Sequence, residues 1–350
     1  MSAAAGSLIP PAGSAQLETA LQSRLARSRR NNGSHGELES LALRLGLIQN
    51  TMAPQLASGS IVVFAADHGL VVDGIQTGGA PPTAQILSAL AAGHLPLSAF
   101  AEMQGLELTV VDSGVAQAVA PHARLLARKI AHGTRNCRLG AAMSIENAHA
   151  AIRAGMEIGA TVGGAAIACA GLGNGSVQSA ALLLSCMSGV FVGEFTGAAS
   201  AEDSELAARQ TRVLELARER HGHLEDPVEV LAAVGGYEIA MMTGLMLEAA
   251  SRRRVIISDG LAASAALAVA AAIAPSTPSY CFHARSNRSA GVERALGLFG
   301  AKAVIDLGFD SLDGTGATFA WPLLRCATAL CADFGVELDA APSPPGRRGA

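Results

Sequence analysis

The stretch Ser60-Ile-Val-Val-Phe-Ala-Ala-Asp-His-Gly69 joins an uninterrupted apolar run to a polar end. A strand that is apolar at every position is buried on both faces, so residues 61–66 predict a strand inside a parallel sheet. In open α/β sheets, ligands bind outside the carboxyl ends of the strands, which is where Asp67 and His68 fall. These two residues indicate either a binding site or a strand-end cap beside a structural histidine.

The same order of apolar strand, polar or glycine end and helix recurs along the chain. We expect further strand ends at Asp112, Gly171, Asp259, Ser286 and Asp313, with residues 123–130 as a less certain strand. Strands that alternate with helices predict an α/β fold with a doubly wound, mainly parallel, Rossmann-like sheet. Residues 50–335 would form this domain, and residues 1–49 would form a small helical lobe with residues 336–350. The candidate functional residues would then gather at one edge of the sheet.

The stretch Ile305-Asp-Leu-Gly-Phe-Asp-Ser-Leu-Asp-Gly-Thr-Gly-Ala317 follows the apolar pair Ala303-Val304 and precedes a helix-compatible run. It predicts a buried strand, a glycine turn and a helix start. Asp313 would stand at the binding edge, where Gly314, Thr315 and Gly316 would offer a hydroxyl and unpaired N–H groups to an anion. The alternative is a plain strand-to-helix connection in which Asp313 caps the helix.

Two further segments suggest ligand contacts. Gly171-Leu-Gly-Asn-Gly-Ser176 follows an apolar stretch and precedes a helix, which predicts an anion cradle of backbone N–H groups or else close packing without a ligand. The pattern is neither the dinucleotide fingerprint nor the Walker loop. Residues 74–82 are rich in glycine and proline and lead into a helix that carries Gln85, so we expect a mobile lid.

Composition excludes several functional classes. The net charge is −4, and no basic patch is interleaved with aromatic residues, which argues against nucleic acid as a partner. Mean hydropathy is +0.35, but the longest apolar stretch, residues 261–274, is shorter than the roughly 20 residues that span a bilayer. No signal peptide is recognised. The six cysteines show no CxxC spacing, so we expect reduced thiols, no zinc site and a cytoplasmic protein.

Several segments, taken together and in order, resemble one family. They are Phe64-Ala-Ala-Asp-His-Gly69, Gly133-Thr-Arg-Asn136, Gly171-Leu-Gly-Asn174, Val234-Gly-Gly-Tyr-Glu-Ile239, Asp259-Gly260, Asn287-Arg-Ser-Ala290 and residues 307–317. The chain is similar to the nicotinate-nucleotide–dimethylbenzimidazole phosphoribosyltransferases of cobalamin lower-ligand assembly. The resemblance implies a parallel α/β domain with a small helical lobe, a homodimer, and transfer of 5-phosphoribose from nicotinate mononucleotide to a benzimidazole base. It implies neither metal nor cofactor.

The resemblance also implies roles for individual residues. Asp313 occupies the position of the general base that removes the proton of the benzimidazole. Gly171, Gly173, Asn174 and Ser289 would hold the phosphate, Arg209 would take the place of a neighbouring lysine, and Gln85 would meet the aromatic base. The remaining substrate contacts fall in the matching motifs at Asp67, His68, Asp259, Gly314, Thr315 and Gly316.

This chain departs from the family pattern at several positions. Asp313 stands where the family has glutamate, which retracts the carboxylate by roughly 1.5 Å. Cys169 replaces a second glutamate, and Gln76 and Glu194 replace a serine and an arginine. An active phosphoribosyltransferase is therefore one hypothesis. The others are an impaired paralogue that binds nucleotide or base as a regulator or heterodimer subunit, and a generic nucleotide-binding domain with another glycosyl acceptor such as adenine or a phenol.

Overall fold

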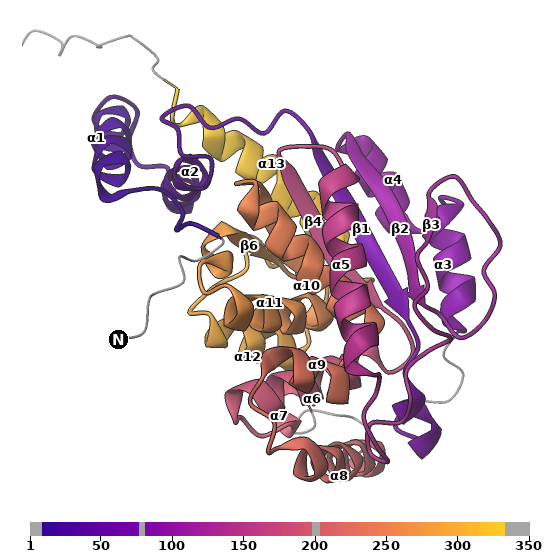
Figure 1. Ribbon diagram of the computed structural model, residues 1–350. Helices are drawn as coiled ribbons and strands as arrows, with labels where there is room; N and C mark the ends of the chain where they lie inside the picture. Colours follow the sequence, from indigo (N-terminus) through magenta and orange to yellow (C-terminus); the bar gives the residue numbers. More distant parts are fainter. Residues whose placement is uncertain (1–8, 77–80, 198–203, 333–350) are drawn as a thin grey trace, which may run out of the picture.

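A single parallel sheet of six strands organises the molecule, in the order β3-β2-β1-β4-β5-β6. The computed structural model describes residues 9–76, 81–197 and 204–332. Every residue of β1 (Gly59–Ala66) is buried, and β1 pairs in parallel with both β2 and β4. The doubly wound, parallel, Rossmann-like fold predicted from the sequence is confirmed (Figure 1).

The remaining elements follow in chain order. They are α1 (Ala15–Asn32), α2 (Glu37–Ile48), η1 (Gly69–Asp73), α3 (Thr83–Ala91), α4 (Pro96–Met103), β2 (Leu106–Gly114), β3 (Leu125–Ala127), α5 (Ile145–Thr161), β4 (Ala166–Leu172), α6 (Ser176–Ser188), α7 (Gly193–Thr196), α8 (Ser204–His221), α9 (Pro227–Val234), α10 (Tyr237–Ser251), β5 (Val255–Asp259), α11 (Leu261–Ile273), η3 (Thr277–Tyr280), β6 (Cys281–Ala284), α12 (Ala290–Leu298) and α13 (Thr315–Ala329).

Helices cover both faces of the sheet. α10 and α11 pack on one face, and α3, α4 and α13 pack on the other. α5 lies outside α10, and the two helices touch backbone to backbone. A methyl group on Gly155 would come 1.9 Å from the Met241 carbonyl oxygen, and one on Gly244 would come equally close, 1.9 Å, to the Ile152 carbonyl oxygen. This crossing therefore requires glycine on both helices.

The N-terminal helices contact the end of the chain's last described helix. α2 packs against α13, and the Arg24 guanidinium donates to the Cys331 carbonyl at 3.0 Å. The Cys331 thiol in turn donates to the Ala42 carbonyl at 3.6 Å. Residues 336–350, the other part of the expected small lobe, lie outside the described residues, so the division into two lobes stays a prediction.

One expectation about strands was wrong. No strand leads directly into Asp313: residues 305–312 form a loop, and just before it Ala303 forms an isolated bridge with His283. Polar side chains break the run, because Asp306 accepts from the Gly308 amide at 3.0 Å and pairs with Arg285 at 3.0 Å. The apolar stretch before Gly171 forms β4, which starts at Ala166 because α5 continues to Thr161.

The edge strand of the sheet and the cap of α5 lie where the sequence indicates. The less certain strand at residues 123–130 is confirmed as β3, at the edge of the sheet. The Ser144 hydroxyl accepts from the Asn147 amide at 3.2 Å, and so caps α5 as its sequence position predicts.

One segment, Thr83–Met103, is long and apolar enough to cross a membrane by length and composition. This is weak support for a membrane helix, because core segments of soluble proteins pass the same test. The segment is divided into α3 and α4 here, and both helices pack against strands of the sheet.

Candidate active site

The strand order changes direction between β1 and β4, because β2 and β3 follow β1 on one side and β5 and β6 follow β4 on the other. A pocket lies at the carboxyl ends of β1 and β4. In this fold such a switch point is the expected ligand site. The volume of the pocket is about 310 Å³. We call it the switch-point pocket; it is lined by Asp67, His68, Gly69, Val71, Pro82, Thr83, Ala116, Gln117, His132, Gly133, Thr134 and Asn174.

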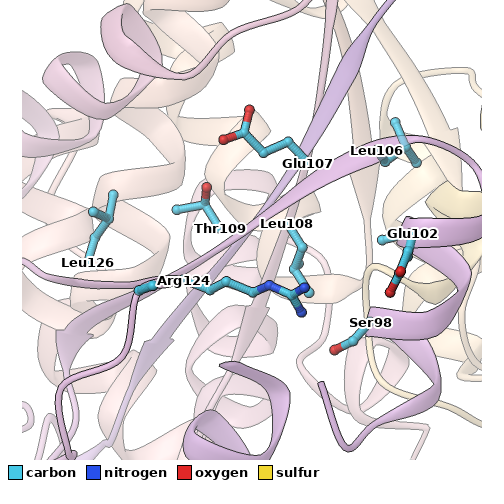
Figure 2. A pocket seen from close by; sticks show the side chains of 10 residues that line it. Ser98, Glu102, Leu106, Glu107, Leu108, Thr109, Arg124 and Leu126 are labelled. Carbon is cyan, nitrogen blue, oxygen red and sulfur yellow. The ribbon is translucent and has the colours of Figure 1, made fainter. Parts of the chain in front are cut away.

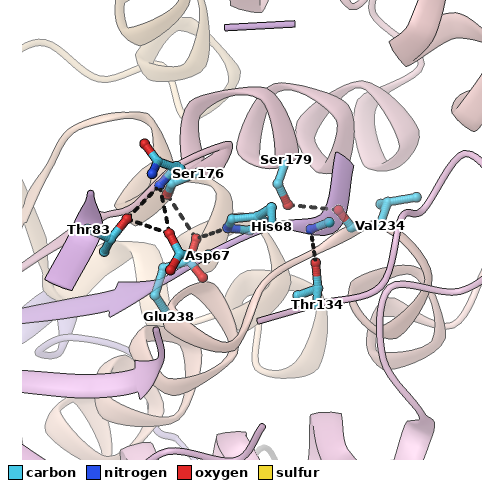
Figure 3. Close-up of polar contacts among 10 residues, drawn as sticks. Asp67, His68, Thr83, Thr134, Ser176, Ser179, Val234 and Glu238 are labelled. Carbon is cyan, nitrogen blue, oxygen red and sulfur yellow. Dashed lines mark hydrogen bonds and ion pairs between the residues drawn. The ribbon is translucent and has the colours of Figure 1, made fainter. Parts of the chain in front are cut away.

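The Asp67 carboxylate ties several chain segments together at this pocket (Figure 3). It accepts from the Thr83 hydroxyl at the start of α3 and, at 2.7 Å, from the Ala116 amide beyond β2. The Asn174 amide, beyond β4, donates to the same Thr83 hydroxyl oxygen at 3.1 Å. Asp67 therefore fixes the pocket wall, and its proposed contact with substrate stays a prediction.

His68 belongs to a buried hydrogen-bonded group behind the pocket. Its Nε2 lies 2.9 Å from Glu238 Oε1, and the Ser176 hydroxyl donates to that same oxygen at 2.8 Å (Figure 3). All three side chains are buried, and Glu238 Oε2 has no partner among the described residues. The sequence did not single out Glu238 as a site residue, although it lies in the motif Val234-Gly-Gly-Tyr-Glu-Ile239.

The glycine turn after β4 is held by close packing. A methyl group on Gly173 would come 1.7 Å from the Ala66 carbonyl oxygen, and one on Gly171 would come 2.8 Å from both Met242 and Ala262. Packing alone thus explains both glycines. The turn nevertheless leads into the N-terminus of α6, where Val177 is about half exposed and lines a second pocket. An anion at this helix start stays a prediction.

The second pocket, about 630 Å³, has Asp313 in its wall. We call it the Asp313 pocket; it is lined by Val177, Leu261, Asn287, Arg288, Ser289, Val292, Gly308, Asp310, Ser311 and Asp313. Ser289 immediately precedes α12, so the starts of α6 and α12 both border this space. Helix N-termini and the exposed Arg288 together favour an anionic group here.

Asp313 has the surroundings of a general base. Its Oδ1 accepts from the Asn287 amide at 2.8 Å, and its carboxyl group lies against Gly260. Burial, together with the charge of Asp259, raises the pKa of Asp313 well above its ordinary range, and the Asn287 hydrogen bond opposes part of this rise. A carboxylate with a raised pKa is a stronger base toward a substrate N–H.

The start of α13 differs from the expectation of free N–H groups. The Gly314 amide donates to Asp259 at 3.0 Å, and the Gly316 amide donates to the Ser286 hydroxyl at 2.7 Å. The Thr315 amide donates to the Leu312 carbonyl at 3.1 Å, and Thr315 is buried. These amides are engaged within the protein rather than unpaired as expected, and a substrate contact at residues 314–316 stays a prediction.

The other predicted residues lie in different settings. Gln85 is exposed on the first turn of α3. Arg209 is exposed on α8, where it pairs with Glu205 at 3.3 Å and lies over Gly74. Neither lines the two pockets as formed by the described residues. Residues 77–80, the centre of the expected lid, lie outside the described part of the chain.

Cys169 is fully buried in β4. Burial raises its pKa well above the ordinary value, with smaller contributions from Cys281 and Asp259, so the thiol stays neutral. As expected from the sequence, it does not replace a carboxylate.

A further hollow, of about 440 Å³, lies between α4 and the β2–β3 edge of the sheet (Figure 2). Its lining includes Glu102, Glu107 and Arg124 but none of the predicted site residues. Among the described residues, no group of three or more His, Cys, Asp or Glu side chains is placed to hold a metal ion.

Comparison with known proteins agrees on one family. A family model described as "Phosphoribosyltransferase" matches residues 10–340. Nicotinate-nucleotide–dimethylbenzimidazole phosphoribosyltransferases from Variovorax paradoxus and Cupriavidus necator are each 37% identical to the chain; both alignments span 90% of it and, respectively, 90% and 92% of the relative. The crystal structure of CobT from Thermus thermophilus superposes with a TM-score of 0.84 at 29% identity, covering 90% of this chain and 96% of that one.

Proposed function

Because the chain belongs to the phosphoribosyltransferase family, we propose that it transfers 5-phosphoribose from nicotinate mononucleotide to 5,6-dimethylbenzimidazole or a related base. The products are α-ribazole 5′-phosphate and nicotinate, as in assembly of the nucleotide loop of cobalamin. The single observation that carries the proposal is the Asp313 carboxyl group, which lies in a pocket bordered by two helix starts and Arg288.

The reaction needs one base and one anion site. One nitrogen of the benzimidazole attacks C1′ of the ribose while the bond from C1′ to the pyridinium nitrogen breaks, and that electron pair goes to nicotinate. The anomeric centre inverts. The proton on the other benzimidazole nitrogen passes to Asp313, whose raised pKa suits it to accept one.

The 5′-phosphate would lie against Ser289 and the starts of α6 and α12, with Arg288 as counter-charge. Asn287 would hold the Asp313 carboxylate toward the acceptor through its 2.8 Å hydrogen bond. Gln85, exposed on the first turn of α3, would contact the base. Asp67 and His68 would shape the neighbouring pocket rather than take part in the proton transfer.

The direct test is an incubation of the purified protein with nicotinate mononucleotide and dimethylbenzimidazole, followed by chromatography for nicotinate and α-ribazole phosphate. Formation of both products in equal amounts supports the proposal. A clear thermal shift with either substrate but no product would instead support a binding protein that lacks catalysis. Adenine and a simple phenol, tested as acceptors in parallel, would reveal a different base preference.

We further propose that the protein works as a homodimer in the cytoplasm, as the resemblance implies. Light scattering coupled to size exclusion would give about twice the chain mass of 35.3 kDa if this is correct. A monomeric mass at working concentration would contradict it.

A further inference from the structure

The most unusual buried group beside the Asp313 pocket is Asp259, at the end of β5. It is fully buried, and its Oδ2 accepts three hydrogen bonds: from the Ser286 hydroxyl at 2.7 Å, and from the Gly314 and Ala317 amides at 3.0 Å each. Its Oδ1 has no partner among the described residues. A buried carboxylate oxygen without a donor is uncommon, because its desolvation is uncompensated.

Asp259 and Asp313 are held next to each other by the backbone. Asp259 binds the amide of Gly314, the residue directly after Asp313. On the other segment, the residue after Asp259 is Gly260, and a methyl group there would come 1.8 Å from Asp313 Oδ2. The Asp313 carboxyl group therefore rests on the peptide that follows Asp259, and only glycine at position 260 leaves space for it.

Among the described residues, the charged and titratable groups around this pair do not neutralise it. Arg288 and Asp310 line the same pocket with opposite charges, and Arg285 is engaged with Asp306 at 3.0 Å. From β4, the Cys169 thiol stays neutral. From β6, burial lowers the pKa of His283 to about 4, so it too is neutral at pH 7. α4, α6 and α11 present the apolar side chains Leu97, Val177 and Leu261.

We propose that Asp259 is a positioning residue for Asp313: it fixes the place of the catalytic carboxyl group through the Gly314 amide and sets a second carboxyl group beside it. This inference rests on the proposed function, in which Asp313 is the base. It replaces the expectation that Asp259 contacts substrate, because a fully buried side chain with three internal donors is not available to a ligand.

The physical reason is the repulsion between two carboxylates that share one site, which makes the protonation of one of them easier. The pKa of Asp313 is raised by burial and by Asp259, and burial raises the pKa of Asp259 itself against its hydrogen bonds. A shorter base than the family glutamate would gain basicity from this arrangement, which partly offsets its retracted position.

Two variants separate the charge of Asp259 from its structural role. Asp259→Asn keeps the size and an oxygen that can accept the three hydrogen bonds but removes the charge. The acid limb of the kcat/KM profile should therefore move to lower pH. Asn287→Ala removes the donor to Asp313 at 2.8 Å, which favours its charged form, so the same limb should move to higher pH.

The inference is supported if the acid limb moves to lower pH in Asp259→Asn and to higher pH in Asn287→Ala. A loss of structure alone would lower kcat in both variants without moving their acid limbs in opposite directions. Unchanged midpoints, or shifts in the same direction, would overturn it.

A second measurement does not depend on catalysis. The Asp313 carboxyl carbon can be followed by ¹³C NMR in the wild-type protein, with its signal assigned by its loss in Asp313→Asn. The inference predicts a midpoint well above the ordinary aspartate value, about 3.9. A midpoint in the ordinary range would overturn it. If Asp259→Asn lowers this midpoint while no ribazole phosphate forms, the carboxyl pair stands and the proposed reaction fails.

Discussion

Glu238→Ala should destabilise the protein more than most substitutions, although Glu238 lies on the first turn of α10 outside the two pocket linings. Its Oε1 accepts from Ser176 at 2.8 Å and lies 2.9 Å from His68 Nε2. The substitution removes the oxygen that both His68 and Ser176 contact. Because all three side chains are buried, His68 and Ser176 would be left as buried polar groups without this partner.

The size of the effect follows from these contacts. Each buried polar group left without its partner costs about 1–3 kcal/mol. The loss is offset in part because Glu238 Oε2 already has no partner among the described residues, so its burial cost disappears with the side chain. We expect a net loss of about 3 kcal/mol in the free energy of unfolding. With an unfolding entropy of roughly 2.1 cal/mol/K per residue, this corresponds to a fall in Tm of about 4 °C for a chain of this length.

Calorimetry on three variants checks this reasoning. Glu238→Gln keeps an oxygen acceptor and should lose less than half as much stability. Glu205→Ala breaks only an exposed pair with Arg209 and should leave Tm unchanged, since such pairs contribute about 0–1 kcal/mol. The reasoning is refuted if Glu238→Ala shifts Tm no more than Glu205→Ala does, or if Glu238→Gln is as damaging as Glu238→Ala.

Four further outcomes are expected. Asp313→Ala should lower kcat by about 10²–10⁴-fold while calorimetry still detects binding of nicotinate mononucleotide; unchanged turnover would remove Asp313 as the base. The pKa of Asp313 is raised in the folded state, so the folded state binds this proton more tightly than the unfolded state does. The stability of the wild type therefore falls as pH rises from the ordinary aspartate pKa, about 3.9, to the raised folded pKa. Asp313→Asn should gain in Tm relative to wild type across that pH range, and a difference in Tm that does not change with pH would contradict this. Gly173→Ala should weaken nucleotide binding and lower Tm, because its methyl group would meet the Ala66 carbonyl at 1.7 Å; a wild-type Tm would show that the turn relaxes freely. Ser289→Ala should raise KM for nicotinate mononucleotide about tenfold with kcat within about twofold, and a fall in kcat alone would place the phosphate elsewhere.

The architecture could be predicted because the information is local. An apolar run such as residues 61–66 has to be buried on both faces, and its parallel partners then follow from the alternation of strands and helices. The polar ends at Asp67 and Asn174 lie at the same pocket for the same reason, since parallel strands end at one edge of the sheet.

The errors concern properties that depend on distant partners. The run at residues 303–306 has the composition of a strand, but its pairing is limited to the bridge of Ala303 with His283, whose carbonyl accepts from the Val304 amide at 2.8 Å. Asp306 forms a turn and an ion pair instead. Glu238 acquires its role from His68, which lies 170 residues away in the sequence. Asp259 looks like a site residue by its position at a strand end, yet the start of α13 encloses it. No local pattern contains these contacts.

The measurement that tests the central claim most directly is a ¹H NMR time course of the purified protein with nicotinate mononucleotide and dimethylbenzimidazole, which resolves the anomeric protons of substrate and product. The account predicts one α-ribazole phosphate for each nicotinate released, with only the α anomer formed. Release of nicotinate with free ribose 5-phosphate, or a β-configured product, would contradict it, as would a substrate spectrum that stays unchanged.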